Sequence, residues 1–181
     1  MILIDGVEIY IREIEQHPGE SHRDAERAAI NSVVSEIFGR ETVVSHYDDG
    51  APYIDGFDGT ISISHSRHIA VIAVDRAGRH IGVDVESWRV ALLNVAPRLL
   101  SVSERRWMDS NTDLLAAWTV KEAVYKALRP AGMSMLEVEL PALPATIGVA
   151  SGVEFTTVTI APDTLLTVAI QYPSPSVYTT S

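Results

Sequence analysis

Cysteine is absent from the 181-residue sequence, which excludes disulfide bonds and thiolate metal sites. Long apolar runs are absent as well, because charged residues interrupt the hydrophobic stretches, and we expect no membrane-spanning segment. The N-terminal residues include Asp5 and Glu8 and lack the basic start that a signal peptide has. Together these absences predict a cytoplasmic protein.

Positive charge is scarce, with 14 Lys and Arg residues against 24 Asp and Glu and a net charge of −10. A nucleic-acid-binding protein needs a basic stripe, so this balance argues against that class. The same negative field disfavours anionic ligands in general. Lys121 and Lys126 are the only two lysines, and a compositional preference for arginine is the simplest explanation.

The composition that remains, 46% hydrophobic and 21% charged, is typical of a globular protein. The length suits one domain or two small halves that share a core. Apolar alternation predicts strands at 2–11, 60–64, 69–75, 81–86, 153–160 and 165–171. Helical spacing predicts helices between Ser21 and Gly39 and at 91–100, 103–109 and 114–128.

Each half of this pattern runs from helix to strands, although no sequence repeat is convincing. We therefore predict an α+β fold of two similar halves, residues 1–90 and 91–172, related by a pseudo-twofold. Such a pair places the active site in the cleft between the halves. Residues 173–181 are rich in Ser, Pro and Thr and are predicted to be a frayed tail.

The predicted strand 81–86 carries two acids on one face, because side chains alternate along a strand and put Asp84 and Glu86 on the same side. In the predicted helix 114–128, Glu122 and Lys126 lie one turn apart, on a polar face that also holds Arg129. If the helix packs over the strand, the carboxylates of Asp84, Glu86 and Glu122 meet beside one ammonium group.

Carboxylates brought together repel one another unless a cation lies between them. Oxygen ligands without sulfur or imidazole suit a hard ion, and Mg²⁺ keeps waters free for phosphate substrates. We therefore predict a Mg²⁺-dependent phosphoryl-transfer site. The ordinary alternatives are solvated strand-end acids and a helical ion pair between Glu122 and Lys126, which is worth only about 0.3–0.5 kcal/mol.

A further polar cluster, Ser64-His65-Ser66, ends the predicted strand 60–64. It lacks the flanking glycines of a hydrolase nucleophile elbow, and His65 with His68 lacks a third ligand at a spacing that suits zinc. A protonated imidazole beside serine hydroxyls suits a phosphate contact, and an ordinary core or surface histidine is the alternative. In the first helix, Arg27 is either a ligand contact or a solvated arginine.

Four motifs in this order resemble those of the 4′-phosphopantetheinyl transferases of the single-chain, surfactin-synthetase type. They are Gly50-Ala51-Pro52, Ile63-Ser64-His65-Ser66, Ile81-Gly82-Val83-Asp84-Val85-Glu86 and Trp118-Thr119-Val120-Lys121-Glu122-Ala123-Val124-Tyr125-Lys126. The resemblance covers about residues 21–171. It implies two α+β halves with coenzyme A bound in the cleft.

The resemblance also implies the roles of individual residues. Asp84, Glu86 and Glu122 match Mg²⁺ ligands, and Glu122 or a metal-bound water accepts the proton of the carrier serine. Lys126 matches the lysine that offsets charge on the diphosphate. The remaining matches are to coenzyme A contacts, namely Arg27, Asp49, Gly50, Ser64, His65 and Lys121.

The implied reaction moves 4′-phosphopantetheine from coenzyme A to a serine of an acyl or peptidyl carrier protein. Carrier surfaces are acidic, so Arg98, Arg105 and Arg106 are candidate docking residues, with a solvated face as the alternative. Both halves lie in one chain, so a monomer is expected.

Three departures from the family pattern leave other functions open. Ala51 stands where the family has a lysine, and Pro130-Ala131-Gly132 lacks another. The basic segment that precedes the first helix in the family is missing, and His17-Pro18-Gly19-Glu20 stands near its place. A non-catalytic relative that binds a carrier protein or nucleotide is one alternative, and a Mg²⁺-dependent phosphatase or nucleotide hydrolase is a second.

Overall fold

The computed structural model describes residues 1–108, 110–129, 134–141 and 146–172. The three α-helices of these ranges are α1 (His22–Phe38), α2 (Ala91–Leu99) and α3 (Asn111–Leu128), and the short 3₁₀ segments are η1 (Glu104–Trp107) and η2 (Met135–Glu137). The strands are β1 (Ile2–Ile4), β2 (Val7–Glu13), β3 (Val44–His46), β4 (Pro52–Ile54), β5 (Thr60–His65), β6 (Ile69–Asp75), β7 (His80–Ser87), β8 (Ile147–Ala150), β9 (Val153–Ala161) and β10 (Thr164–Gln171). The α+β class is confirmed.

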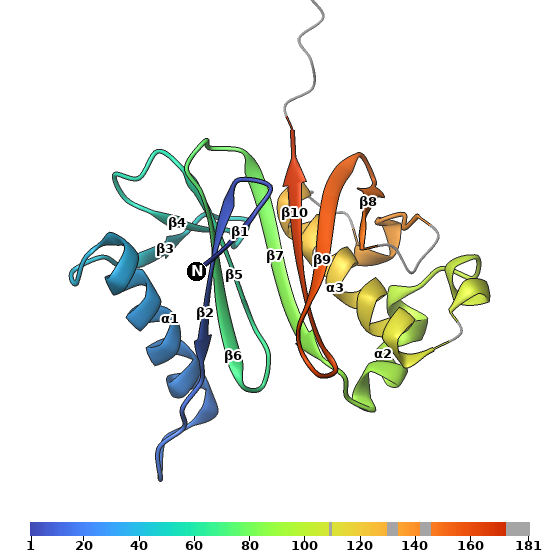
Figure 1. Cartoon of the computed structure of the whole chain (residues 1–181), viewed down its shortest axis with the longest axis horizontal. Helices are drawn as coiled ribbons and strands as arrows, with labels where there is room; N and C mark the ends of the chain where they lie inside the picture. Colours follow the sequence, from blue (N-terminus) through green and yellow to red (C-terminus); the bar gives the residue numbers. More distant parts are fainter. Residues whose placement is uncertain (109, 130–133, 142–145, 173–181) are drawn as a thin grey trace, which may run out of the picture.

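The strands form two four-stranded antiparallel sheets, in the orders β1-β2-β6-β5 and β7-β10-β9-β8, and β3 pairs with β4 in a small hairpin. Figure 1 shows the two sheets side by side, with α1 against the first sheet and α3 against the second. The pseudo-twofold and the boundary at residue 90 stay predictions. β7 lies before that boundary, but it pairs with β10 in the second sheet.

One hydrophobic core joins the two sheets, because the strands alternate their faces. Ile9 and Val71 of the first sheet pack with Val83 and Val168 of the second. The opposite face of the first sheet packs on α1, and that of the second packs on α3. On β7 the odd-numbered residues therefore enter the shared core, while Asp84 and its even-numbered neighbours face the side that α3 covers.

Side-chain hydroxyls, rather than a ladder of backbone bonds, join β5 to β7. The backbone N–H of Val83 donates to Ser62 Oγ at 3.0 Å, and that of Val85 donates to Ser64 Oγ at 3.2 Å. Buried backbone donors need a partner, and these serines supply it. The seam between the sheets is therefore polar and lies beside Asp84.

Several predicted boundaries need correction. Residues 2–11 form a hairpin instead of one strand, because Asp5 and Gly6 both adopt positive φ and turn the chain. The predicted helix 103–109 is only the 3₁₀ segment η1, and Asp109 lies outside the described residues. Sequence reasoning missed β8, which has only four residues. Residues 130–132 and the predicted frayed tail also lie outside the described ranges.

Serine side chains cap the N-termini of α1 and α3, whereas Ser103 makes no side-chain cap hydrogen bond at η1. Ser21 accepts a hydrogen bond from the backbone N–H of Asp24, and Gly39, with φ 107°, ends α1. Ser110 forms a capping box with Asp113, so α3 begins at Asn111 instead of the predicted Leu114. Among the described residues, no helix is long and apolar enough to cross a membrane.

Candidate active site

The position of α3 depends on Gly82, where the helix crosses β7. A Cβ atom added to Gly82 would collide with the backbone of Ala123 and would lie 2.8 Å from the backbone nitrogen of Ala127. The missing side chain therefore allows the helix backbone to approach the strand. This close crossing brings Glu122 and Lys126 of α3 next to the acidic face of β7.

Asp84 lies at the centre of this junction and is only 5% exposed. Its Oδ1 atom accepts hydrogen bonds from Ser64 Oγ at 2.8 Å and from Lys126 Nζ at 3.0 Å. Lys126 Nζ also donates to the carbonyl of Val83 at 3.0 Å. The other oxygen, Asp84 Oδ2, is buried and has no hydrogen-bond partner among the residues that the structure describes.

Glu122 is electrostatically coupled to the same group of charges. Burial raises its pKa, Lys126 lowers it, and the carboxylates of Asp84 and Glu86 raise it again. The net effect is a raised pKa. Glu122 therefore lies close enough to Asp84, Glu86 and Lys126 for their charges to shift its pKa.

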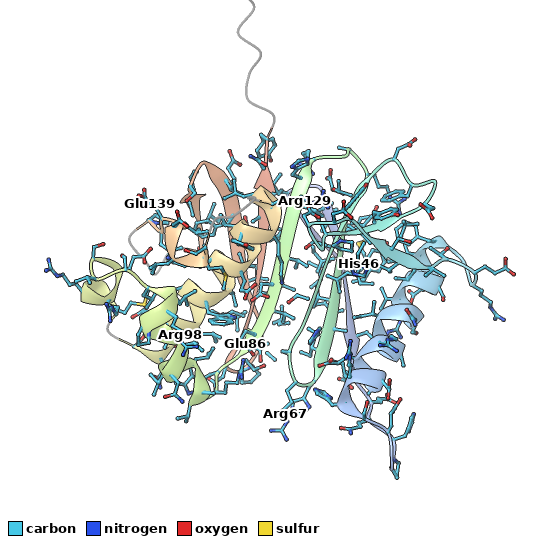
Figure 2. All side chains as sticks on the ribbon, turned by 180° about the vertical axis from the view of Figure 1, so that it is seen from behind. His46, Arg67, Glu86, Arg98, Arg129 and Glu139 are labelled. Atoms are coloured by element: carbon cyan, nitrogen blue, oxygen red, sulfur yellow. The ribbon has the colours of Figure 1, made fainter. Side chains whose placement is uncertain are left out.

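Glu86 makes local contacts that the sequence did not predict. Its carboxylate accepts hydrogen bonds from Arg89 Nη2 and from the backbone N–H of Ser87, both at 2.9 Å. Figure 2 shows Glu86 near the end of β7, on the side of the second sheet. An arginine thus neutralises the third acid of the group.

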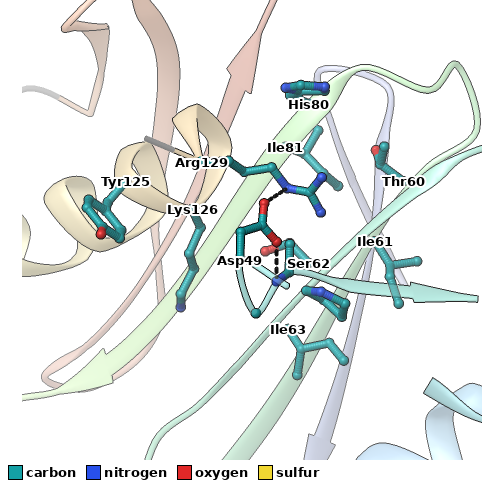
Figure 3. A pocket seen from close by; sticks show the side chains of 13 residues that line it. Asp49, Thr60, Ile61, Ser62, Ile63, His80, Ile81, Tyr125, Lys126 and Arg129 are labelled. Atoms are coloured by element: carbon teal, nitrogen blue, oxygen red, sulfur yellow. Dashed lines mark hydrogen bonds and ion pairs between the residues drawn. The ribbon is translucent and has the colours of Figure 1, made fainter. Parts of the chain in front are cut away.

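A pocket of about 400 Å³ lies at the other end of the seam, where β5, β7 and the end of α3 meet the 49–52 loop (Figure 3). Ile61, Ile63 and Ile81 give it apolar walls, and Lys126 and Arg129 bring positive charge from α3. The predicted residues Asp49 and Gly50 also line it. The pocket therefore combines apolar surface with cations.

Arg129 is a pocket residue whose role sequence reasoning missed. Its guanidinium carbon lies 5.0 Å from the centroid of the Tyr47 ring, and its Nε lies 3.9 Å from Asp49 Oδ2. The helical spacing from Glu122 and Lys126 was the available signal, because it places Arg129 on the same polar face.

His65 ends β5 beside α1, and Glu26 of that helix is its partner. His65 Nδ1 lies 3.1 Å from Glu26 Oε1, and His22 Nε2 lies 3.3 Å from the same oxygen. Sequence reasoning missed Glu26, since its contact with β5 is tertiary. Ser66 Oγ is buried and has no hydrogen-bond partner in the described part of the chain.

The family model of the 4′-phosphopantetheinyl transferase superfamily matches residues 80–157. The match supports that superfamily. It spans less than half of the chain, but it includes β7 and α3 with Asp84, Glu122 and Lys126. The superfamily implies a transferase that acts on phosphopantetheine. A search of curated proteins found no match.

Of the six residues that the resemblance assigns to coenzyme A, Asp49 and Gly50 line the pocket, and Arg27, Ser64, His65 and Lys121 do not. Lys121 is completely buried, and its Nζ donates to Glu104 Oε2 at 3.0 Å and to the carbonyls of Met135 and Leu136 at 3.5 Å. This placement gives Lys121 a structural role, in which it ties α3 to η1 and η2.

Burial raises the pKa of Glu104, the partner of Lys121. Hydrogen bonds from the backbone of Ser101, from Lys121 and from the backbone of Leu140 outweigh this effect, and the pKa is below its ordinary value. Arg27 does not line the pocket either. It is exposed, and it forms a 3.9 Å ion pair with Asp24 on its own helix.

The carboxylates fit a hard cation in their chemistry, although not yet in their arrangement. Within the described ranges, no three His, Cys, Asp or Glu side chains are placed so that they could hold a metal ion. Asp84 Oδ2, however, is a buried carboxylate oxygen without a hydrogen-bond partner among the described residues, and burial together with the charges of Asp84 and Glu86 raises the pKa of Glu122. Both features suit a site for a divalent cation.

Proposed function

We propose that this protein transfers 4′-phosphopantetheine from coenzyme A to a serine of an acyl or peptidyl carrier protein in a Mg²⁺-dependent reaction. One observation carries the proposal: Asp84, paired with Lys126, lies beside a pocket with apolar walls and cations. A protein of this type acts as a monomer in the cytoplasm, where coenzyme A and carrier proteins meet.

The pocket suits the nucleotide end of coenzyme A. Its volume of about 400 Å³ is within the range of small-molecule sites. The isoleucines of β5 and β7 give apolar surface for a base, and Lys126 and Arg129 offer positive charge to phosphates. Lys126 lies between the pocket and Asp84, so a diphosphate that it binds extends toward the acids.

Asp84 and Glu122 would hold the Mg²⁺ ion, with Glu86 as a third ligand after it leaves Arg89. The ion would neutralise diphosphate charge and act as a Lewis acid. Ser64 contributes indirectly, because its hydroxyl donates to Asp84 Oδ1 and leaves Oδ2 free for a cation.

In the proposed reaction, the hydroxyl oxygen of the carrier serine attacks the β-phosphorus, and the bond to the oxygen of 3′,5′-ADP breaks. Glu122, or a water held by the metal ion, would accept the serine proton. Lys126 faces the negative charge that develops on the leaving diphosphate oxygen.

The carrier protein is proposed to dock beside α2. A groove of about 600 Å³ runs between α2, η1 and the start of α3, and Leu93, Leu114 and Arg105 line it. Arg98 and Arg106 are exposed nearby, and Figure 2 shows Arg98 on this side of the second sheet. Apolar surface flanked by arginines suits an acidic helix of a carrier protein.

A binding protein without turnover is a second candidate. The Glu86–Arg89 contact favours this candidate, because the Arg89 guanidinium binds the carboxylate oxygen that a metal ion would otherwise bind. Ala51 favours it as well, since the 49–52 loop carries no lysine to the pocket.

The decisive experiment incubates the purified protein with a panel of carrier proteins that lack the prosthetic group, and reads the intact mass of each carrier. We expect one carrier to gain the mass of phosphopantetheine only when coenzyme A and Mg²⁺ are both present. Carrier binding by calorimetry without any mass gain would favour the binding protein. Phosphate release from coenzyme A without a carrier would instead indicate a phosphohydrolase.

A further inference from the structure

Arg129 occupies a backbone conformation that arginine rarely adopts. It is the C-cap of α3, with φ 49° and ψ 49°, in the left-handed region. Glycine is the usual residue there because it has no Cβ to collide with the backbone. A non-glycine residue in this region carries strain, and such residues cluster at binding sites, where surrounding contacts hold them in place.

The side chain of Arg129 is supported on one face by the ring of Tyr47. Its guanidinium lies over Tyr47, whose ring centroid lies 4.4 Å from that of Tyr53 on β4, with the two rings tilted by 32°. Tyr47 holds the charge by cation–π attraction, which leaves the N–H donors free at the edge of the guanidinium. The hairpin β3–β4 thus fixes the position of the cation.

Asp49 is the one acidic partner of Arg129 among the residues that the structure describes, and it holds Arg129 loosely. Asp49 Oδ1 accepts a hydrogen bond from the backbone N–H of Ala51 at 2.9 Å, and Asp49 Oδ2 lies 3.9 Å from Arg129 Nε. A distance of 3.9 Å is too long for a hydrogen bond. Within the described ranges, the guanidinium therefore keeps its hydrogen-bond donors available. Figure 3 shows Arg129 and Asp49 together at the pocket.

The positive charge of Arg129 matters for binding an anion, because the 49–52 loop brings no positive charge to the pocket. Ala51 lines the pocket with a methyl group, and the net charge of −10 repels a polyanion. We infer that Arg129 binds a phosphate of the nucleotide part of coenzyme A, so that the end of α3 supplies a cation that the opposite loop lacks. This inference rests on the proposed function.

The test compares Arg129→Gly and Arg129→Lys with the unmodified protein and with Arg40→Ala. Arg40 is exposed and does not line the pocket, so its removal changes the net charge equally. Calorimetry measures the affinity for coenzyme A and for dephospho-coenzyme A, which lacks the 3′-phosphate. Thermal unfolding measures the stability of each variant.

We expect Arg129→Gly to bind coenzyme A about tenfold to a hundredfold more weakly, the range for a lost charged hydrogen bond. Its unfolding temperature should not fall, because glycine suits the left-handed conformation. Arg129→Lys should recover part of the affinity, and Arg40→Ala should bind as the unmodified protein does. A loss seen with coenzyme A but not with dephospho-coenzyme A assigns the contact to the 3′-phosphate, and equal losses assign it to the diphosphate.

The inference and the proposed function fail in different ways. If the unmodified protein binds coenzyme A and Arg129→Gly binds it equally well, the inference is wrong and the proposed function stands. If Arg40→Ala weakens binding as much as Arg129→Gly does, the effect is general electrostatics and the inference is again wrong. If the unmodified protein binds no coenzyme A, both are wrong.

Discussion

Lys126 Nζ lies 3.0 Å from Asp84 Oδ1, although the two residues are 42 positions apart in the chain. The pair joins α3 to β7 and uses only one of the two oxygens of Asp84. Asp84 is therefore fixed by its neighbours, and its Oδ2 atom has no hydrogen-bond partner among the described residues and could bind a cation. The junction of α3 and β7 thus raises two questions, namely whether Asp84 binds a cation and which contacts keep α3 against β7.

Replacing Glu122 with Gln should change the pH dependence of stability. A carboxyl group whose pKa is raised by folding destabilises the folded state once it ionises, so the unmodified protein loses stability as pH rises from 4.5 through the raised pKa. Glu122→Gln removes this charge and should unfold at a higher temperature at neutral pH, but not at pH 4. The measurement is thermal unfolding in EDTA across this range.

The same Glu122→Gln variant should lose phosphopantetheine transfer by about 10²-fold or more, because it lacks the proton acceptor. Matched carrier-modification assays at saturating coenzyme A check this, with Arg40→Ala as the control. Full activity of Glu122→Gln would remove Glu122 from the proposed chemistry.

Removing Arg89 should strengthen metal binding. Arg89 Nη2 donates to Glu86 Oε2, and Arg89→Ala frees that oxygen for a cation. We expect Mg²⁺ to raise the unfolding temperature of Arg89→Ala at lower concentrations than it does for the unmodified protein. Asp84→Asn should abolish the response to Mg²⁺ in either background. An unchanged Mg²⁺ midpoint in Arg89→Ala would show that Glu86 is not a ligand.

Gly82→Ala should destabilise the fold, since the new methyl group meets the backbone of Ala123. Backbone yields less than a side chain, and overpacking of this kind costs about 1–3 kcal/mol or more. Gly148→Ala is the comparison, because its Cβ would lie 2.9 Å from the side-chain ring of Phe155 instead of 1.9 Å from a backbone oxygen. Denaturant unfolding compares the two. If the two variants have equal free energies of unfolding, the backbone of α3 does not lie as close to Gly82 as the contact with Ala123 indicates.

The buried pair of Lys121 and Glu104 should behave as a structural unit. Lys121→Met leaves Glu104 buried without its cation, which costs about 3–5 kcal/mol. The double variant Lys121→Met with Glu104→Leu should recover most of that stability, because it removes both charges. Denaturant unfolding gives the coupling energy. If Lys121→Met instead keeps full stability and loses only affinity for coenzyme A, Lys121 is a ligand contact.

Sequence patterns predicted the elements of the site better than its contacts. Alternation on β7 put Asp84 and Glu86 on one face, and helical spacing put Glu122, Lys126 and Arg129 on another. The family resemblance, and not the periodicity, grouped Lys121 with the coenzyme A contacts, yet Lys121 is buried against Glu104. Glu26 gave no sequence signal as a partner of His65, because that contact joins distant segments of the chain. Arg89 is only three residues from Glu86 but lies beyond the end of β7, where the strand period no longer applies.

The sequence by itself determined which side chains share a face, because the periods of a strand and a helix are fixed by local backbone geometry. It also determined the ends of α1 and α3 through Ser21, Gly39 and Ser110, whose capping is local. Only the tertiary structure decided that Gly82 lets α3 lie on β7 and that Arg129 lies over Tyr47 at the pocket. Those contacts depend on how closely distant segments pack, which no local pattern encodes.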